Sequence, residues 1–166
     1  MFLRPADAHE ASALSKLALR SKGYWGYPAS FLDACRAELT IDPDDVGRLR
    51  LVLAENAGAT LGFYSLTGEP PEGELGHLFV EPSWIRRGVG RRLWEHMHRS
   101  AGALGFSVVR IEADPGAVAF YEAMGARQVG AVSSGSIPGR ALPLLVFEVS
   151  PRGRSDGARP PSAPGA

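Results

Sequence analysis

One stretch of the sequence, from Leu49 to Ala103, constrains the fold more than any other. Three apolar segments, 49–54, 60–66 and 74–80, are separated by turns rich in Asn, Gly and Pro, and predict an antiparallel meander of strands. Pro82 ends the third strand, because proline has no N–H for a sheet ladder. A turn with two glycines then leads into a helix whose apolar residues recur on one face.

Further elements flank this stretch on both sides. They are a strand over 2–4, a helix capped by Asp7 with Ala11, Leu14, Leu17 and Ala18 on one face, a helix with Phe31, Leu32, Cys35 and Leu39 on one face, a strand over 106–113, a helix over 114–125, and strands over 127–132 and 142–149. The Gly-rich and aromatic segment 21–28 should end the first helix. The order of elements predicts an α/β fold with a mixed, mostly antiparallel sheet of about six to seven strands flanked by about four helices.

The 166 residues predict one domain over 1–149. From residue 150 to 166 the Pro, Gly, Ser and Arg content leaves nothing to bury, so we expect a disordered tail. Pro5 and Asp7 interrupt the start too early for a signal peptide, and no apolar run is long enough to span a membrane. The single cysteine, Cys35, excludes a disulfide framework and a Cys-rich zinc site. We therefore expect a cytoplasmic protein.

The net charge of the chain is zero, but the basic residues are unevenly distributed along the sequence. The 18 basic and 18 acidic residues cancel, so the molecule has no long-range attraction for nucleic acid or an anionic membrane. Sixteen of the 18 cations are Arg, and four of them lie between Arg86 and Arg92. A nucleic-acid binder using this cluster is disfavoured, because no aromatic residues are interleaved with it.

The turn before the central helix is suited to an anion. Gly88 and Gly90 allow a close backbone approach, and the first N–H groups of a helix have no internal partner. Neighbouring Arg side chains would strengthen phosphate binding there. The Gly-Lys-Ser/Thr of a P-loop is missing, and only two of the three glycines of a dinucleotide fingerprint are present. The alternative is an ordinary turn followed by a solvated basic helix face.

Two motifs within 74–126 resemble the GNAT superfamily of acyl-CoA-dependent N-acyltransferases. The segment Ile85–Gly90 is similar to Gln/Arg-x-x-Gly-x-Gly/Ala, with Ile85 in place of the polar first residue. About thirty residues on, Asp114–Ala126 is similar to Asn-x-x-Ala-x-x-Phe-Tyr-x-x-x-Gly-Phe. There Asp114 replaces Asn, which it can match as a helix cap, and Ala126 replaces Phe.

The resemblance implies a GNAT-like domain that uses acetyl-CoA as co-substrate, without a metal. The backbone N–H groups of about 86–91 would hold the pyrophosphate, and Arg86 and Arg87 could reach the 3′-phosphate. A backbone N–H of the central strand would stabilise the oxyanion, on a strand that a bulge often splays from its neighbour. The expected co-substrate residues are Phe79, Val80, Glu81, Arg86, Arg87, Gly88, Val89, Gly90 and Arg91.

Three residues are candidates for catalysis. Tyr121 occupies the position where many family members place the Tyr that protonates the departing CoA sulfur, although it could be a core aromatic. Glu74 and His77 are candidate bases for the acceptor amine; strict alternation places them on opposite faces of the strand. A solvated strand end and a structural histidine are the alternatives for these two residues, and a water chain could replace both. His96 and His98 are interpreted as surface residues.

The acceptor site is the least determined part. The resemblance places Tyr24 and Trp25 over it, where they could bind an apolar or cationic acceptor, and Arg140 could take a carboxylate. Core packing and a plain hairpin connection are the alternatives. We expect a small-molecule amine acceptor, with direct attack on the thioester in a ternary complex, and a possible homodimer. A catalytically inactive CoA-binding sensor or partner domain of the same fold is the competing hypothesis.

Overall fold

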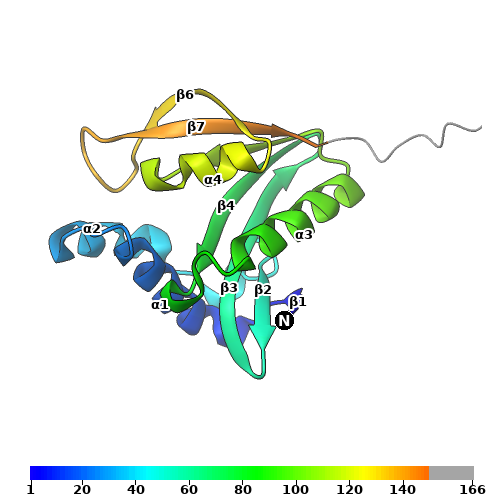
Figure 1. Ribbon diagram of the computed structural model, residues 1–166, viewed down its shortest axis with the longest axis horizontal. Coiled ribbons are helices and arrows are strands. Elements are labelled where there is room, and N and C mark those ends of the chain that lie inside the picture. Colours follow the sequence, from blue (N-terminus) through cyan, green and yellow to red (C-terminus); the bar gives the residue numbers. More distant parts are fainter. Residues whose placement is uncertain (150–166) are drawn as a thin grey trace, which may run out of the picture.

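The computed structural model describes residues 1–149 and joins seven strands into one sheet, in the order β1-β2-β3-β4-β5-β7-β6 (Figure 1). The strands are β1 (Phe2–Pro5), β2 (Val52–Asn56), β3 (Ala59–Glu69), β4 (Glu72–Val80), β5 (Val108–Glu112), β6 (Arg127–Ser133) and β7 (Ala141–Glu148). The helices are α1 (Ala11–Gly23), α2 (Ala29–Leu39), α3 (Val89–Leu104) and α4 (Val118–Ala123), with 3-10 turns η1 (Ala8–Glu10), η2 (Pro43–Asp45), η3 (Pro82–Trp84) and η4 (Pro115–Ala117). All paired strands are antiparallel except β4 and β5. The predicted α/β fold with a mixed, mostly antiparallel sheet is confirmed.

Two apolar clusters hold helices to the two faces of the sheet. On one face, α3 lies across β3 and β4 and buries Val89, Leu93, Trp94, Met97 and Ala101, the stripe expected from its spacing (Figure 1). On the other face, α1 and α2 bury their own stripes against β2 and β3. Burial of apolar area on both faces is the main stabilising term of such a sheet.

The first helix runs further than its composition suggested. It continues through Ser21 and Lys22 to Gly23, whereas the segment from 21 onward was expected to end it. Ser21 is buried and Lys22 reaches a carboxylate, so tertiary contacts outweigh the weak local propensity. Asp7 precedes the helical region as predicted, and its backbone N–H donates to Glu10 Oε2 at 2.9 Å.

The predicted meander is present, with shifted bounds. β2 begins at Val52 rather than at residue 49, because Arg50 adopts a positive φ of 45° that breaks the extended chain. The next two strands are longer than predicted and nearly meet in a tight turn between Glu69 and Glu72. β4 ends at Val80, and η3 starts at Pro82 as expected.

A β-bulge in β4 corrects the expected assignment of faces. Ser65 pairs with His77 but Leu66 pairs with Leu75, so Gly76 is an extra residue. Leu75 consequently lies in the same apolar cluster as Val80, the face to which strict alternation had not assigned it. Residues before the bulge change faces, and Glu74 moves to the face of His77.

β4 and β5 separate after a short parallel contact. Their pairing consists of three residue pairs, which join Glu72–Glu74 with Val108–Arg110. Beyond Glu74, the remaining length of β4 has an edge that no described strand covers. The splaying that the family resemblance implied is therefore present, and the bulge lies just beyond the last paired residue.

The second half of the sheet carries the short helix α4. Asp114 accepts a hydrogen bond from the Gly116 N–H at 3.0 Å and starts η4, and Gly125 adopts a φ of 96° just after the helix ends. β6 and β7 then close the sheet beside α4 (Figure 1).

The predicted domain, 1–149, stays a prediction. The predicted disordered tail, 150–166, lies outside the described residues. None of the helices in residues 1–149 has the length and apolarity needed to cross a membrane.

Candidate functional site

A cavity of about 1130 Å³ opens where β4 and β5 separate. Its walls come from the end of α1, the α1–α2 segment, β4, the turn before α3, and α4. Of the predicted residues, it brings together Glu74, His77, Phe79, Val80, Arg86, Gly88, Gly90, Arg91, Tyr121, Tyr24 and Trp25. Glu81, Arg87, Val89 and Arg140, also predicted as site residues, do not line it.

The turn before α3 presents free backbone donors to the cavity. Gly88 is left-handed, with φ 84°, and Arg92 N–H donates to its carbonyl at 3.1 Å as the helix begins. The N–H groups of Val89, Gly90 and Arg91 have no backbone partner within residues 1–149. A helix start with free N–H groups and neighbouring guanidinium groups can bind phosphate.

The side chains around this turn divide into two groups. Arg86 and Arg91 are exposed and line the cavity, and Arg86 has a strained φ of 64°. Arg87 instead stacks over the Trp84 ring at 5.4 Å, and Val89 is buried in the core. Of the two arginines predicted to serve a phosphate, Arg86 therefore lines the cavity and Arg87 does not, and the phosphate contact of each stays a prediction.

The open edge of β4 carries two outward N–H groups. Glu81 N–H donates to the Leu61 carbonyl at 2.8 Å, and hydrogen-bonded pairs alternate along an antiparallel ladder. The N–H groups of Phe79 and Glu81 therefore point to β3, whereas those of Leu78 and Val80 point to the open edge. This shifts the expected oxyanion donor, predicted within 79–81, toward Leu78 and Val80.

The C-terminal end of this edge is held by α1. Val80 N–H donates to the buried Ser21 Oγ at 3.3 Å. Glu81 forms a bidentate pair with Arg20, whose Nη2 lies 2.7 Å from Oε2, so this carboxylate turns away from the cavity. The Glu81 side chain therefore does not line the cavity, and a contact of this residue with the co-substrate stays a prediction.

Tyr121 lies in α4 with its side chain almost fully buried. Only 7% of the residue is exposed, and the ring packs 5.8 Å from that of Trp94. Its hydroxyl forms no hydrogen bond with another described residue, and the residue lines the cavity. Burial, followed by the charge of Asp114, raises the pKa of Tyr121 well above its usual range. The phenol is therefore protonated at neutral pH.

His77 and Glu74 line the same cavity in different environments. His77 Nδ1 lies 2.8 Å from Ser65 Oγ in a hydrogen bond, and burial lowers the pKa of His77 to about 4. The imidazole is therefore neutral at pH 7 but a weak base. Glu74 is exposed and forms no ion pair with another described residue.

The two predicted aromatic residues line the cavity from the α1–α2 segment. Tyr24 and Trp25 are each 44% exposed and meet edge to face, with ring centroids 5.4 Å apart. A Cβ placed on Gly116 would lie 2.7 Å from Trp25 Cε3, so the indole packs directly on that backbone. Trp25 thus bridges the α1–α2 segment and the start of η4.

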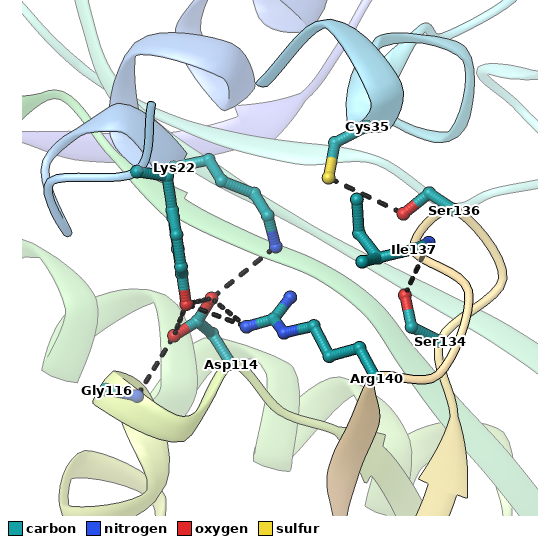
Figure 2. A network of polar contacts seen from close by, with 9 residues as sticks. Lys22, Cys35, Asp114, Gly116, Ser134, Ser136, Ile137 and Arg140 are labelled. Atoms are coloured by element: carbon teal, nitrogen blue, oxygen red, sulfur yellow. Dashed lines mark hydrogen bonds and ion pairs between the residues drawn. The ribbon is translucent and has the colours of Figure 1, made fainter. Parts of the chain in front are cut away.

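Asp114 is the centre of a polar network that the sequence did not reveal (Figure 2). Tyr27 donates its hydroxyl to Asp114 Oδ2 at 2.9 Å, and Arg140 Nη2 lies 3.4 Å from the same oxygen. Lys22 Nζ lies 3.5 Å from it. Arg140 also donates to the Tyr27 hydroxyl at 2.7 Å and stacks over the ring of Phe31 at 4.8 Å.

This network bears on the expectation for Arg140. Its guanidinium is engaged by Asp114 and Tyr27 and the residue does not line the cavity, so these contacts disfavour binding of an acceptor carboxylate by Arg140, which stays a prediction. The loop that carries it is held further by a contact of 3.5 Å between Cys35 Sγ and Ser136 Oγ (Figure 2). The α1–α2 segment, η4 and the β6–β7 loop therefore meet at Asp114.

Two histidines expected on the surface are half-buried instead. His96 Nδ1 lies 2.8 Å from the Tyr64 hydroxyl, and the His98 ring packs 4.9 Å from that of Phe147. Within residues 1–149, no three His, Cys, Asp or Glu side chains converge in a way that could hold a metal ion.

Comparison with a family model identifies the domain. The model described as an acetyltransferase (GNAT) domain matches residues 29–135, which is more than half of the chain. A search of curated proteins gives no match.

Solved structures agree on the fold. PaiA N-acetyltransferase from Thermoplasma acidophilum, in complex with coenzyme A, has a TM-score of 0.75 and 16% identity, over 89% of this chain and 98% of that chain. A GCN5-related N-acetyltransferase from Rhodopseudomonas palustris has a TM-score of 0.74 and 23% identity, over 89% of this chain and 94% of that chain. The ribosomal-protein-S18-alanine N-acetyltransferase from Escherichia coli has a TM-score of 0.68 and 18% identity, over 93% and 97%. At these identities the likeness shows the fold alone.

Proposed function

The chain belongs to the GNAT acetyltransferase family, and on that basis we propose that it transfers an acetyl group from acetyl-CoA to a small-molecule primary amine by direct attack in a ternary complex. One observation carries the proposal. A helix start with free N–H groups, an open strand edge and a buried phenol all border one cavity. These are the three groups that binding a phosphorylated thioester and releasing its thiolate require.

Binding of the co-substrate is assigned to the turn before α3 and to the edge of β4. The N–H groups of Val89, Gly90 and Arg91 would receive the pyrophosphate, with Arg86 adding a charge-assisted bond. The amide groups of the pantetheine arm would pair with the outward N–H and C=O groups of β4. One outward N–H would also serve the developing oxyanion, and Leu78 supplies one that is not already bonded to Ser21.

Tyr121 is assigned the role of general acid. The amine attacks the thioester carbonyl, and collapse of the tetrahedral intermediate expels the CoA thiolate, which takes the phenolic proton. The raised pKa of Tyr121 keeps that proton in place at neutral pH, and the hydroxyl has no competing partner among the described residues.

Glu74 is assigned the role of the base that takes a proton from the attacking amine. An ammonium group must lose a proton before it can attack. Glu74 is exposed in the cavity wall, where a carboxylate can pair with the ammonium and pass its proton to water, whereas burial disfavours a charged His77 and lowers its pKa to about 4. The bulge at Gly76 moves Glu74 to the face of His77, so the two residues share the cavity. His77 would then orient the acceptor by a hydrogen bond.

The Tyr121→Phe variant tests this mechanism. We expect kcat to fall by roughly 10²–10⁴-fold, with acetyl-CoA affinity nearly unchanged, because only the proton donor is lost. Thiol release with an amine panel measures the rate, and calorimetry measures acetyl-CoA binding.

Tyr64→Phe is the matched control. It removes another buried hydroxyl, bonded to His96 in the core and outside the cavity, so kcat should not change. Wild-type turnover in Tyr121→Phe would remove Tyr121 from the mechanism. Acetyl-CoA binding without transfer to any amine would instead favour the inactive CoA-binding alternative.

A further inference from the structure

We infer that the acceptor carries a carboxylate in addition to its amine, and that the Lys22 ammonium binds this carboxylate. The inference rests on the proposed function, because it names the class of acceptor for the same cavity. It follows from an imbalance of charge at the cavity wall, where Lys22 lines the cavity and shares the single carboxylate of Asp114 with Arg140.

The three charged groups are almost buried. The exposed fractions of the side chains are 11% for Lys22, 13% for Asp114 and 17% for Arg140. Neither cation has another ion-pair partner in residues 1–149, so two positive charges face one negative charge. A buried charge without compensation is costly, and an anionic group placed beside it would be stabilised.

Asp114 has no capacity left for a ligand. Its Oδ1 accepts from the Gly116 N–H at 3.0 Å and lies 3.1 Å from the Tyr27 hydroxyl. Its Oδ2 accepts from that hydroxyl at 2.9 Å and from Arg140 at 3.4 Å. An acceptor amine would therefore find no free carboxylate oxygen here.

Lys22 has N–H donors that no described residue uses. Its Nζ lies 3.5 Å from Asp114 Oδ2, too far for a strong hydrogen bond, and it donates no hydrogen bond to any residue of 1–149. Its other close neighbours are the rings of Tyr27 and Phe31, at 5.9 and 5.8 Å. An ammonium group has three N–H donors, so a ligand oxygen could be accepted without breaking a bond.

Lys22 and Arg140 differ in their access to the cavity. Lys22 lines the cavity that Tyr121 and His77 also line, whereas Arg140, which is hydrogen-bonded to Tyr27, does not. Glu38, also in the cavity wall, is exposed and screened by water, so it opposes a carboxylate only weakly. The carboxylate site expected at Arg140 is thus reassigned to Lys22.

The test compares acceptors that differ only in charge. The twenty proteinogenic amino acids and their α-amides are assayed as acceptors with acetyl-CoA, by thiol release. For the best substrates, kcat/KM should favour the acid over its amide by on the order of 10- to 100-fold, the value of one charge-assisted hydrogen bond. In Lys22→Met this preference should vanish through a higher KM for the acid, with kcat, the KM for the amide and the KM for acetyl-CoA unchanged.

The matched control is Lys16→Met, at the only other lysine of the chain, exposed on the same helix. It should behave as wild type. Transfer to amines without a preference for acids in the wild-type enzyme would overturn the inference and leave the proposed function intact, whether or not Lys22→Met folds. A preference that persists in Lys22→Met, or a higher KM for acetyl-CoA in that variant, would also overturn it. Failure to acetylate any amine would overturn the proposed function and this inference together.

Discussion

Burial of His77 predicts a pH-dependent loss of stability that the variant His77→Gln should lack. The pKa of His77 falls from 6.5 to about 4 in the folded chain, because the charged imidazole would lose its hydration. Between these two pH values the unfolded chain binds a proton that the folded chain does not. The contribution of neutral His77 is therefore complete above pH 6.5 and is lost as the pH falls toward 4.

The magnitude follows from the two pKa values. Between pH 7.5 and pH 5, the free energy of unfolding should fall by about 2 kcal/mol on account of this one residue. For a domain of this size that corresponds to a decrease in Tm of about 4–8 °C. Glutamine does not titrate and can still form a hydrogen bond with Ser65, so the variant removes the titration and keeps that bond.

The assay is urea unfolding of both proteins at pH 7.5 and pH 5. The other titrating groups are the same in the wild type and in His77→Gln. The difference between the two decreases in the free energy of unfolding, from pH 7.5 to pH 5, is therefore due to His77. Equal losses in the two proteins would show that the imidazole is hydrated. That result would refute the reasoning and return His77 to the list of candidate bases.

Two further perturbations probe the phosphate turn and the polar network. Acetyl-CoA at 100 times Kd should stabilise the wild type by about 2.7 kcal/mol, and Gly88→Glu should abolish this in thermal unfolding, since a carboxylate at the helix start repels phosphate. Gly58→Glu, at another open glycine of positive φ, controls for backbone strain, and an equal loss there would contradict the assignment. Asp114→Ala should lower the free energy of unfolding in urea by about 2–3 kcal/mol, because two nearly buried cations lose their partner. Asp33→Ala, which breaks an exposed ion pair, should cost less than about 1 kcal/mol, and a similar cost for both would contradict the network's role.

The fold was predictable from the sequence because its signals are local. The stripe of α3, the proline after β4 and the cap at Asp114 each report the conformation of a few neighbouring residues. The bulge at Gly76 was not placed by periodicity, because one extra residue leaves no mark on composition. Its consequence, the shared face of Glu74 and His77, was therefore missed.

The part of the candidate site that a short stretch of sequence determines was predictable. Gly88 and Gly90 lie in the cavity wall because the turn itself exposes their backbone. The contact between Arg140 and Asp114 was not predictable, because the two residues are distant in sequence and Asp114 has the position of a helix cap. Lys22 and Ser21 carried no motif, and the only available signal was the rarity of lysine in a chain that otherwise uses arginine.

The short pairing between β4 and β5 makes the sheet mechanically incomplete. Three residue pairs connect its two halves through the backbone, and beyond Glu74 their continuity depends on apolar packing beneath α3. A co-substrate whose amides pair with β4 would act as a temporary strand across this gap. The hydrogen bonding across the sheet would then be continuous only while that molecule is bound. Each round of acetyl transfer would break and re-form the hydrogen bonds between it and β4.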